Sequence, residues 1–228
     1  MSHINSRRSG DTRAQIIRVG AKHFIEDGYT KTTMKLLSQE LDLSPGNITF
    51  YFSTKDHLLA VLINELFDFQ NSVMERSVTN EKDPIFVYCL EFVTIAALCA
   101  ENEVAKDFYT SAYTSPYTLD LIRKKGTQKA RIVFGDFCKG FSEEDWIATE
   151  AVVCGIEYGA ITVSEKNTEL RLVAERALNS IMILYGVPEH LREQRISRAL
   201  SLDYKDLGRR ILFEFREYID KLNEASEI

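Results

Sequence analysis

Apolar residues recur at spacings of three and four along almost the entire chain, and this helical period constrains the fold more than any other feature. Near the N-terminus one such stripe consists of Ile17, Ala21, Phe24 and Ile25. Each of the four prolines stands where a helix would begin or end: Pro45, Pro84, Pro116 and Pro188. No segment alternates apolar and polar residues with the period of two that a half-buried strand shows. The sequence therefore predicts an all-α protein.

The pattern places a succession of helices along the chain. A flexible N-terminal arm is expected at residues 1–11, because the opening residues are polar and lack periodicity. The expected helices cover residues 11 or 12 to 27, a short segment after the N-cap Thr33, 45–52, 55–78, 83–100, 103–115, 118–141, 142–163, 168–185 and 203–222, with 188–199 as a further candidate.

Three of these helices lie within about 45 residues, and a tight turn joins the short second and third helices, as in a helix-turn-helix DNA reader. Ser44 is suited to cap the third helix, and Pro45 suits its first position. The small Gly46 and the polar Asn47 would let this end of the helix enter a DNA groove. Ile48 and Phe52 are four residues apart and would anchor the helix to its neighbours.

Charge is distributed unevenly along the 228 residues. The formal net charge is −6, which argues against a protein that coats nucleic acid generally. Residues 1–57 hold 8 Lys and Arg against 6 Asp and Glu, a net +2, and the remainder holds 20 against 28, a net −8. This asymmetry is compatible with a polyanion-binding end.

The segment from residue 13 to residue 59 resembles the N-terminal domain of the TetR family of transcriptional regulators. The resemblance rests on Arg13 and Ile17, on the string FIEDGYTKTTM at residues 24–34, and on LSPGNITFYFSTKDHLL at residues 43–59. Two positions depart from the family pattern. Asp42 stands where the family commonly has a turn glycine, and Asp tolerates a left-handed backbone better than most residues. Thr49 stands where the family commonly has a phosphate-contacting tyrosine, and it keeps only a shorter hydroxyl.

The resemblance implies that residues 12–57 are a DNA-binding domain. The residues expected to contact double-stranded operator DNA are Thr33, Ser44, Pro45, Gly46, Asn47, Thr49, Phe50, Tyr51 and Lys55.

Several of these positions have an alternative interpretation. Phe50 either meets a thymine methyl group or packs against a neighbouring helix. Asn47 either pairs with an adenine edge or helps to cap its helix, and Lys55 either binds phosphate, as the family's matching lysine does, or is a solvated surface lysine. Arg7 and Arg8 either enter the minor groove or belong to a tail without a role.

Residues 58–228 are expected, from the resemblance, to form a larger helical domain for ligand binding and dimerisation. A homodimer interface is expected within residues 142–185, where Gly155 and Gly159 either allow a close helix approach between subunits or serve internal packing. The helix at 203–222 exceeds the usual family plan and either caps the domain or extends the interface.

A pocket for an unknown small-molecule effector is expected in this domain. Amphipathic side chains of the type that line ligand cavities are Tyr88, Phe92, Phe108, Tyr109, Tyr113, Tyr117, Trp146 and Tyr158, together with Glu150. If Glu150 or Glu157 points inward, a cationic ligand is indicated.

Other classes of protein are less compatible with the sequence. The four histidines are scattered, and no catalytic, phosphate-binding or dinucleotide motif is present, so neither an enzyme nor a metal or other cofactor is expected. The four cysteines lie in apolar runs and are expected to be buried thiols in a reducing cytoplasm. Neither a signal peptide nor a membrane span is expected.

The sequence thus indicates a cytoplasmic, homodimeric, sequence-specific DNA-binding regulator, most simply a repressor released by its ligand. The alternatives are an activator or a helical protein–protein adaptor with a degenerate DNA-binding domain.

Overall fold

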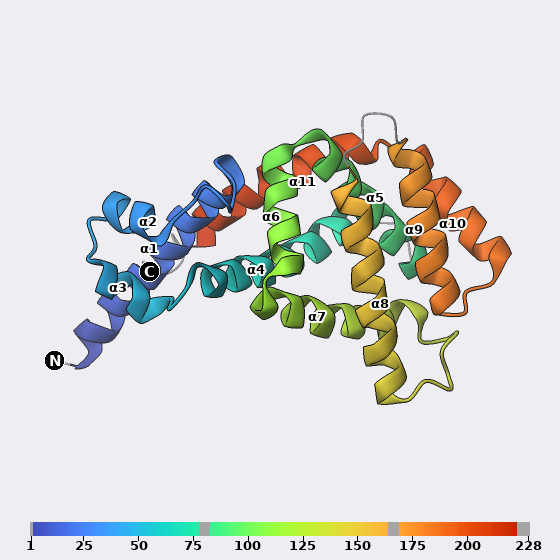
Figure 1. The fold of residues 1–228 in the computed structure, drawn as a ribbon, viewed down its shortest axis with the longest axis horizontal. Coiled ribbons are helices and arrows are strands. Elements are labelled where there is room, and N and C mark those ends of the chain that lie inside the picture. Colours follow the sequence, from blue (N-terminus) through green and yellow to red (C-terminus); the bar gives the residue numbers. More distant parts are fainter. Residues whose placement is uncertain (1, 78–82, 164–168, 223–228) are drawn as a thin grey trace.

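The computed structural model describes residues 2–77, 83–163 and 169–222. Within these ranges the chain forms helices and no strand, so the prediction of an all-α fold is confirmed (Figure 1). The helices are α1 (Ser2–Glu26), α2 (Met34–Glu40), α3 (Pro45–Tyr51), α4 (Lys55–Ser77), α5 (Pro84–Glu101), α6 (Glu103–Thr114), α7 (Pro116–Phe134), α8 (Glu143–Thr162), α9 (Leu170–Leu184), α10 (Glu189–Ser201) and α11 (Tyr204–Leu222).

Helix α1 begins much earlier than expected. Residues 2–11, assigned above to a flexible arm, continue the helix, so that assignment was wrong for their secondary structure. No proline precedes Pro45, and the single Gly10 costs a helix only about 1 kcal/mol. The mostly polar residues 2–11 therefore continue α1 toward the N-terminus, and the later turns of this helix are held in place by their buried side chains. Residues 1, 78 and 168, on which other predictions fall, lie outside the described ranges.

Helix α7 ends earlier than expected. It stops at Phe134, and residues 135–141 form turns instead of the predicted final helical turns. Cys138 is buried in this segment, and its thiol donates a hydrogen bond to the carbonyl of Tyr185 at 3.3 Å. Phe137 and Phe141 are half-buried in this loop, which the Cys138 bond holds to the end of α9.

The remaining predicted helices are found within a few residues of their expected ends. The candidate helix at 188–199 is present as α10. Side chains cap some of these helix starts: Asp83 accepts from two backbone N–H groups at the start of α5, and Ser142 and Asp145 form a capping box at the start of α8.

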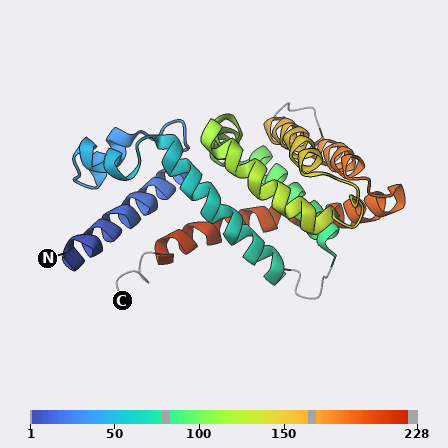
Figure 2. The ribbon, with the colours of Figure 1, turned by 90° about the horizontal axis from the view of Figure 1, so that it is seen from below.

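Helices α1–α3 form a small domain at one end of the molecule, and α4 leads from it into a larger bundle (Figures 1 and 2). Helix α5 lies in the interior of that bundle. It is the one described helix that is long and apolar enough to span a membrane, but 67% of it is buried inside the protein. Its apolar character therefore matches the centre of a helical core.

Helix α11 packs along the bundle and reaches the small domain (Figure 2). The ring of Phe215 lies 5.4 Å from that of Phe69 on α4, and the hydroxyl of Tyr218 donates to Glu65 at 3.3 Å. Arg216 forms an ion pair with Glu26 of α1. Of the two alternatives above, these contacts favour a helix that caps the domain.

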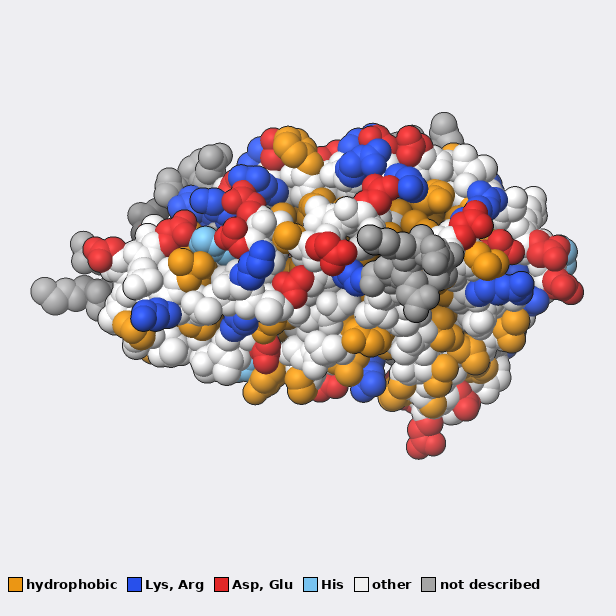
Figure 3. Space-filling view, turned by 45° about the horizontal axis from the view of Figure 1, so that its top comes forward, with side chains coloured by type: hydrophobic (Ala, Val, Ile, Leu, Met, Phe, Trp, Pro, Cys, Tyr) orange, Lys and Arg blue, Asp and Glu red, His pale blue; other side chains and the backbone are white. Residues whose placement is uncertain are grey.

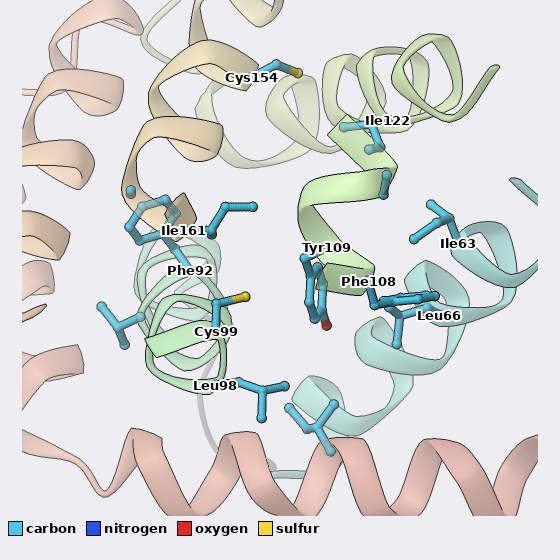
Figure 4. Packing of buried hydrophobic residues seen from close by; sticks show 14 of the residues in the cluster. Ile63, Leu66, Phe92, Leu98, Cys99, Phe108, Tyr109, Ile122, Cys154 and Ile161 are labelled. Carbon is cyan, nitrogen blue, oxygen red and sulfur yellow. The ribbon is translucent and has the colours of Figure 1, made fainter. Parts of the chain in front are cut away.

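The core is continuous from the small domain into the bundle. Figure 4 shows part of it, with side chains from α4, α5, α6, α7 and α8 facing one another. All four cysteines are buried free thiols, as predicted, and burial raises the pKa of Cys89 and of Cys99 to about 12. They act as small apolar side chains within the core.

Candidate nucleic-acid interface and inner cavity

The helix-turn-helix is held at both helix starts by side-chain caps. The hydroxyl of Thr33 accepts from the N–H of Leu36 at 3.1 Å, and that of Ser44 accepts from the N–H of Asn47 at 3.2 Å. Each cap satisfies an N–H group that the helix itself leaves unpaired. Ser44, and not Asn47, therefore caps the start of α3. The side chain of Asn47 is exposed.

The turn between α2 and α3 depends on a left-handed residue at Asp42. Its φ is 51°, and it alone has positive φ among the described residues other than glycine. The N–H of Leu43 bonds to the carbonyl of Ser38 at 2.9 Å and that of Asp42 to Gln39 at 3.3 Å. These two bonds are a Schellman motif with Asp42 in the position usually held by glycine. The expectation that Asp42 supports this turn is confirmed.

Helix α3 is anchored by one face and exposed on the rest. Ile48 is 0% exposed and the following Phe52 is 2% exposed, whereas Phe50 is 79% exposed. The other exposed residues of this segment are Ser44, Pro45, Gly46, Asn47 and Thr49, and Tyr51 is half-buried. The ring of Phe50 contacts that of Tyr51 edge to face, with 5.1 Å between centroids. The alternative in which Phe50 packs into a helix interface is excluded by its exposure.

The hydroxyl of Thr49 is used inside its own helix. It donates to the carbonyls of Pro45 and Gly46, at 3.1 Å each. Its hydrogen is therefore engaged before any DNA arrives, and a phosphate contact by Thr49 stays a prediction.

Lys55 holds the segment between α1 and α2. Its ammonium donates to the carbonyls of Tyr29 at 2.8 Å and Thr32 at 2.9 Å, and it lies 3.9 Å from the centroid of the Tyr29 ring. Burial lowers the pKa of this lysine, against the opposing effect of Asp107 and Asp56. The solvated alternative is wrong, since the side chain is half-buried and bonded; its phosphate role stays a prediction.

A carboxylate of the bundle also reaches this segment. Asp107 on α6 accepts from the N–H of Thr30 at 2.7 Å and from the hydroxyl of the same residue. Gly28 has a φ of 98°, and a Cβ there would lie 2.8 Å from the Asp107 carboxylate. The loop is thus tied to α4 by Lys55 and to α6 by Asp107.

The larger domain encloses a cavity of about 90 Å³ between α4, α5, α6, α7, α8 and α9. Figure 4 shows some of its lining side chains arranged around a common space: Ile63, Leu66, Phe92, Tyr109, Ile122 and Ile161. Of the residues predicted for a ligand pocket, five line it: Tyr88, Phe92, Tyr109, Tyr113 and Glu150. Glu157 also lines it.

Four predicted pocket residues do not line this cavity. Phe108 is buried beside a smaller cavity near α11. Tyr117 is largely exposed at the start of α7, where its ring meets His57 at 4.4 Å between centroids. Trp146 is buried among Phe141, Tyr185 and Arg131. These predictions were wrong for this cavity, because amphipathic composition does not specify the direction in which a helical side chain points.

Tyr158 does not line the cavity either: it lies on the partly exposed face of α8.

One end of the cavity is acidic. The hydroxyl of Tyr185 donates to Glu150 at 2.7 Å, and those of Tyr113 and Tyr88 donate to Glu157 at 2.9 and 3.2 Å. Burial, with the nearby Glu157, raises the pKa of Glu150 to about 7. Burial likewise raises the pKa of Glu157, in spite of its two tyrosine donors.

Sequence reasoning missed four polar residues of the cavity, Gln70, Glu91, Lys129 and Tyr185, and also Gly126. Lys129 forms an ion pair with Glu91. A signal for Glu91 was available, since it is the one charged residue between residues 84 and 100 of the most apolar helix. The others carry no such signal.

The outer faces of α8 and α9 expose apolar side chains. They are Ile147, Val152, Tyr158, Leu172, Ile183 and Leu184. Figure 3 shows hydrophobic side chains gathered on the half of the molecule that carries these helices. A Cβ added at Gly155 or Gly159 would have no described atom within 4 Å. The internal-packing alternative for both glycines is therefore wrong.

Comparison with known proteins agrees with this geometry. Residues 16–62 match the family model described as bacterial regulatory proteins, tetR family. Over 114 residues the chain is 29% identical to the HTH-type transcriptional regulator HbdR of Aromatoleum sp. (strain CIB). That alignment covers 50% of this chain and 48% of HbdR, so the chain matches about half the length of this curated relative.

A solved structure shares the fold over most of the chain. The full-length native structure of TylP, a TetR regulator from Streptomyces fradiae, superposes with a TM-score of 0.53 at 15% identity, covering 92% of each chain. At this identity the likeness shows the fold alone.

Proposed function

We infer that the protein is a sequence-specific transcriptional regulator, because residues 16–62 match the family model of the bacterial tetR regulators. It acts as a homodimeric repressor in the cytoplasm and leaves its operator when a small molecule binds. One observation carries the DNA-binding role: α3 is seated by Ile48 and exposes Phe50 and Asn47 on its outer side. An exposed phenylalanine contributes nothing to the folded core, whereas in the major groove it can contact a thymine methyl group.

A homodimer is proposed because a single helix-turn-helix contacts few bases. Dimers of such domains bind half-sites about 34–36 Å apart, one turn of the duplex. The exposed apolar face of α8 and α9 supports this assembly, since it lies outside the small domain and includes the uncovered Gly155 and Gly159. Glycine at an interface lets two helix backbones approach closely.

Release by a ligand is proposed to run through the loop between α1 and α2. Tyr109 and Tyr113 line the cavity and belong to α6, the same helix whose Asp107 binds Thr30. A ligand that prefers one position of α6 therefore biases the position of the DNA-binding domain. The DNA-bound and ligand-bound states of the dimer differ in the spacing of its two α3 helices.

The test begins with selection of bound duplexes from a random library by the full-length protein, followed by footprinting. We expect an inverted repeat whose half-sites are one helical turn apart. Phe50→Ala should weaken binding to the selected site about tenfold or more, since a good contact to a base edge is worth about 1–3 kcal/mol. Asn47→Ala should relax preference at one base position of each half-site.

The matched control is Phe213→Ala, which removes another exposed phenylalanine, 64% accessible, from α11. It should leave DNA affinity unchanged. Weak, salt-sensitive retardation of every sequence alike would support the adaptor alternative instead. A reporter gene that rises, not falls, when the regulator is supplied would replace repressor by activator.

A further inference from the structure

The cavity has two chemically different ends. Aliphatic and aromatic side chains such as Ile63, Leu66 and Phe92 form one part of the wall, and the carboxyl groups of Glu150 and Glu157 lie at another. Resting on the proposed function, we propose that the effector is an organic cation, with its charged group beside Glu150 and Glu157 and its apolar body against the aliphatic wall.

The charges of the wall do not balance. Three carboxyl groups line the cavity, from Glu91, Glu150 and Glu157, and Lys129 is the sole lysine or arginine among its described lining residues. Lys129 already forms an ion pair with Glu91. Glu150 and Glu157 therefore face the cavity without a paired cation in the wall.

The hydrogen-bond donors to these two residues are neutral groups, and Lys129 attracts both carboxylates from a distance without forming an ion pair with either. Tyr185 donates to Glu150, and Tyr88 and Tyr113 donate to Glu157. A buried carboxylate without a counter-charge is costly, and hydroxyl donors offset only part of this cost. A bound ammonium would supply the missing charge. The tyrosine rings add faces that attract a desolvated cation.

The position of the Glu150 carboxylate depends on a glycine. A Cβ at Gly126 of α7 would lie only 1.9 Å from Oε1 of Glu150, so any other residue there would displace the carboxylate. The chain thus leaves room for an acid that is only 4% exposed at this point of the cavity wall. Glu150 and Glu157 are also seven residues apart on α8, two helical turns, and so face the same side.

Ligands of other charge fit the wall less well. A carboxylate or phosphate would meet two acidic groups whose like charge disfavours it. A neutral ligand would gain the apolar contacts alone. The order of affinity for one apolar body should therefore be cation, neutral, anion.

The test uses three probes that share a phenylbutyl body: 4-phenylbutylammonium, 4-phenylbutanol and 4-phenylbutyrate. The amine keeps its proton near neutral pH, as a lysine does. Isothermal titration calorimetry with the full-length protein at pH 7.5 should show the ammonium binding about tenfold or more tightly than the alcohol, the size expected for charge-assisted hydrogen bonds. The carboxylate should bind most weakly. Equal affinity for ammonium and alcohol, or no binding of the ammonium, would overturn the proposal.

Substitutions then locate the charged group. Glu150→Gln and Glu157→Gln keep the shape and a hydrogen-bond acceptor but remove the charge. Each should weaken ammonium binding about tenfold and change alcohol binding less than about threefold. The matched control is Glu144→Gln, at an exposed position of the same helix, which should change neither. Equal loss for both ligands would instead show a damaged cavity and contradict the charge pairing.

This outcome is separable from the DNA-binding role. The calorimetry needs no DNA, and operator binding by the same preparations is measured by gel shift. Loss of the ammonium preference with intact operator binding would remove the cation proposal and keep the regulator. A protein that binds the ammonium but no operator DNA would remove the regulator proposal and keep the cation site.

Discussion

Lys55 has structural contacts that its position in the sequence did not reveal. The DNA-phosphate role expected for it came from family resemblance, whereas its ammonium is bonded to the carbonyls of Tyr29 and Thr32. Lys55→Met keeps the aliphatic stem and removes both donors. We expect the free energy of unfolding to fall by about 1–3 kcal/mol, because the carbonyl of Thr32 loses its Lys55 donor and that of Tyr29 keeps only the N–H of Thr32. Urea unfolding followed by circular dichroism measures this change.

Lys35→Met is the control for Lys55→Met, since Lys35 is exposed on α2 and its change should stay within about 0.5 kcal/mol. A Lys55→Met protein of unchanged stability, with weaker DNA binding and a smaller salt dependence, would show that phosphate binding is the main role of Lys55.

Glu150 makes the stability of the protein depend on pH. Its pKa is raised from 4.5 to about 7, mainly by burial, so between these values the folded protein binds more protons than the unfolded chain. The free energy of unfolding contributed by this group must therefore fall as the pH rises from about 4.5 to about 7. Glu150→Gln removes this dependence. As the pH rises across this range, the free energy of unfolding of the variant should increase relative to that of the wild type, by about 3 kcal/mol at most.

Urea unfolding at pH 5, 6, 7 and 8 measures the difference, with Glu144→Gln as control. A wild-type advantage that grows with pH would contradict the raised pKa. Glu157, whose pKa is also raised, keeps part of the slope in the variant.

At the scale of elements, the turn between α2 and α3 shows how one conformation can be supplied by different residues. The same pair of hydrogen bonds closes the end of α9, where the left-handed position is held by Gly186 with φ of 67°. At the end of α2 it is held by Asp42 with φ of 51°. The backbone geometry is common to both ends, and Asp at this position carries the steric cost of a Cβ.

Asp42→Gly should therefore raise the melting temperature or leave it unchanged, and Asp42→Val should lower it, since a β-branched residue is strained at positive φ. The expected separation between these two variants is about 1–2 kcal/mol. A lower melting temperature for Asp42→Gly would show that the carboxylate itself stabilises the turn.

At the scale of the molecule, the exposed apolar face of α8 and α9 needs a partner for the proposed function. Ile183→Asp places a charge on this face and should shift sedimentation from dimer toward monomer. Affinity for the paired operator should fall with it, because each head then binds alone. Phe213→Asp on α11 is the control and should remain dimeric. A dimer that persists in Ile183→Asp would place the interface elsewhere.

The tie between the small domain and the bundle is also a property of the whole molecule. Residues 28–32 contact α4 through Lys55 and α6 through Asp107, and α11 adds the Arg216–Glu26 ion pair. Lys55, Asp107 and Arg216 lie far from one another and from residues 28–32 in the sequence. Under the proposed function, these contacts supply the route by which a ligand inside the bundle would affect α3 without touching it.

The sequence alone predicted most of the helices, which residues of α3 are buried and which exposed, and the buried thiols. Those features follow from local periodicity, caps and turn residues, which act over a few positions of the chain. The left-handed turn at Asp42 was predictable for the same reason. The helical start of α1 and the early end of α7 were not, because weak local signals leave helix ends to be fixed by context.

Only the tertiary structure decided which polar residues meet inside the bundle. Tyr88, Tyr113 and Tyr185 come from three helices and reach carboxyl groups of a fourth, while Tyr117 and Trp146 have similar chemistry and point elsewhere. The direction of a side chain in a packed bundle depends on how helices distant in sequence are rotated against one another. That rotation is set by the packing of the whole core and by no local pattern.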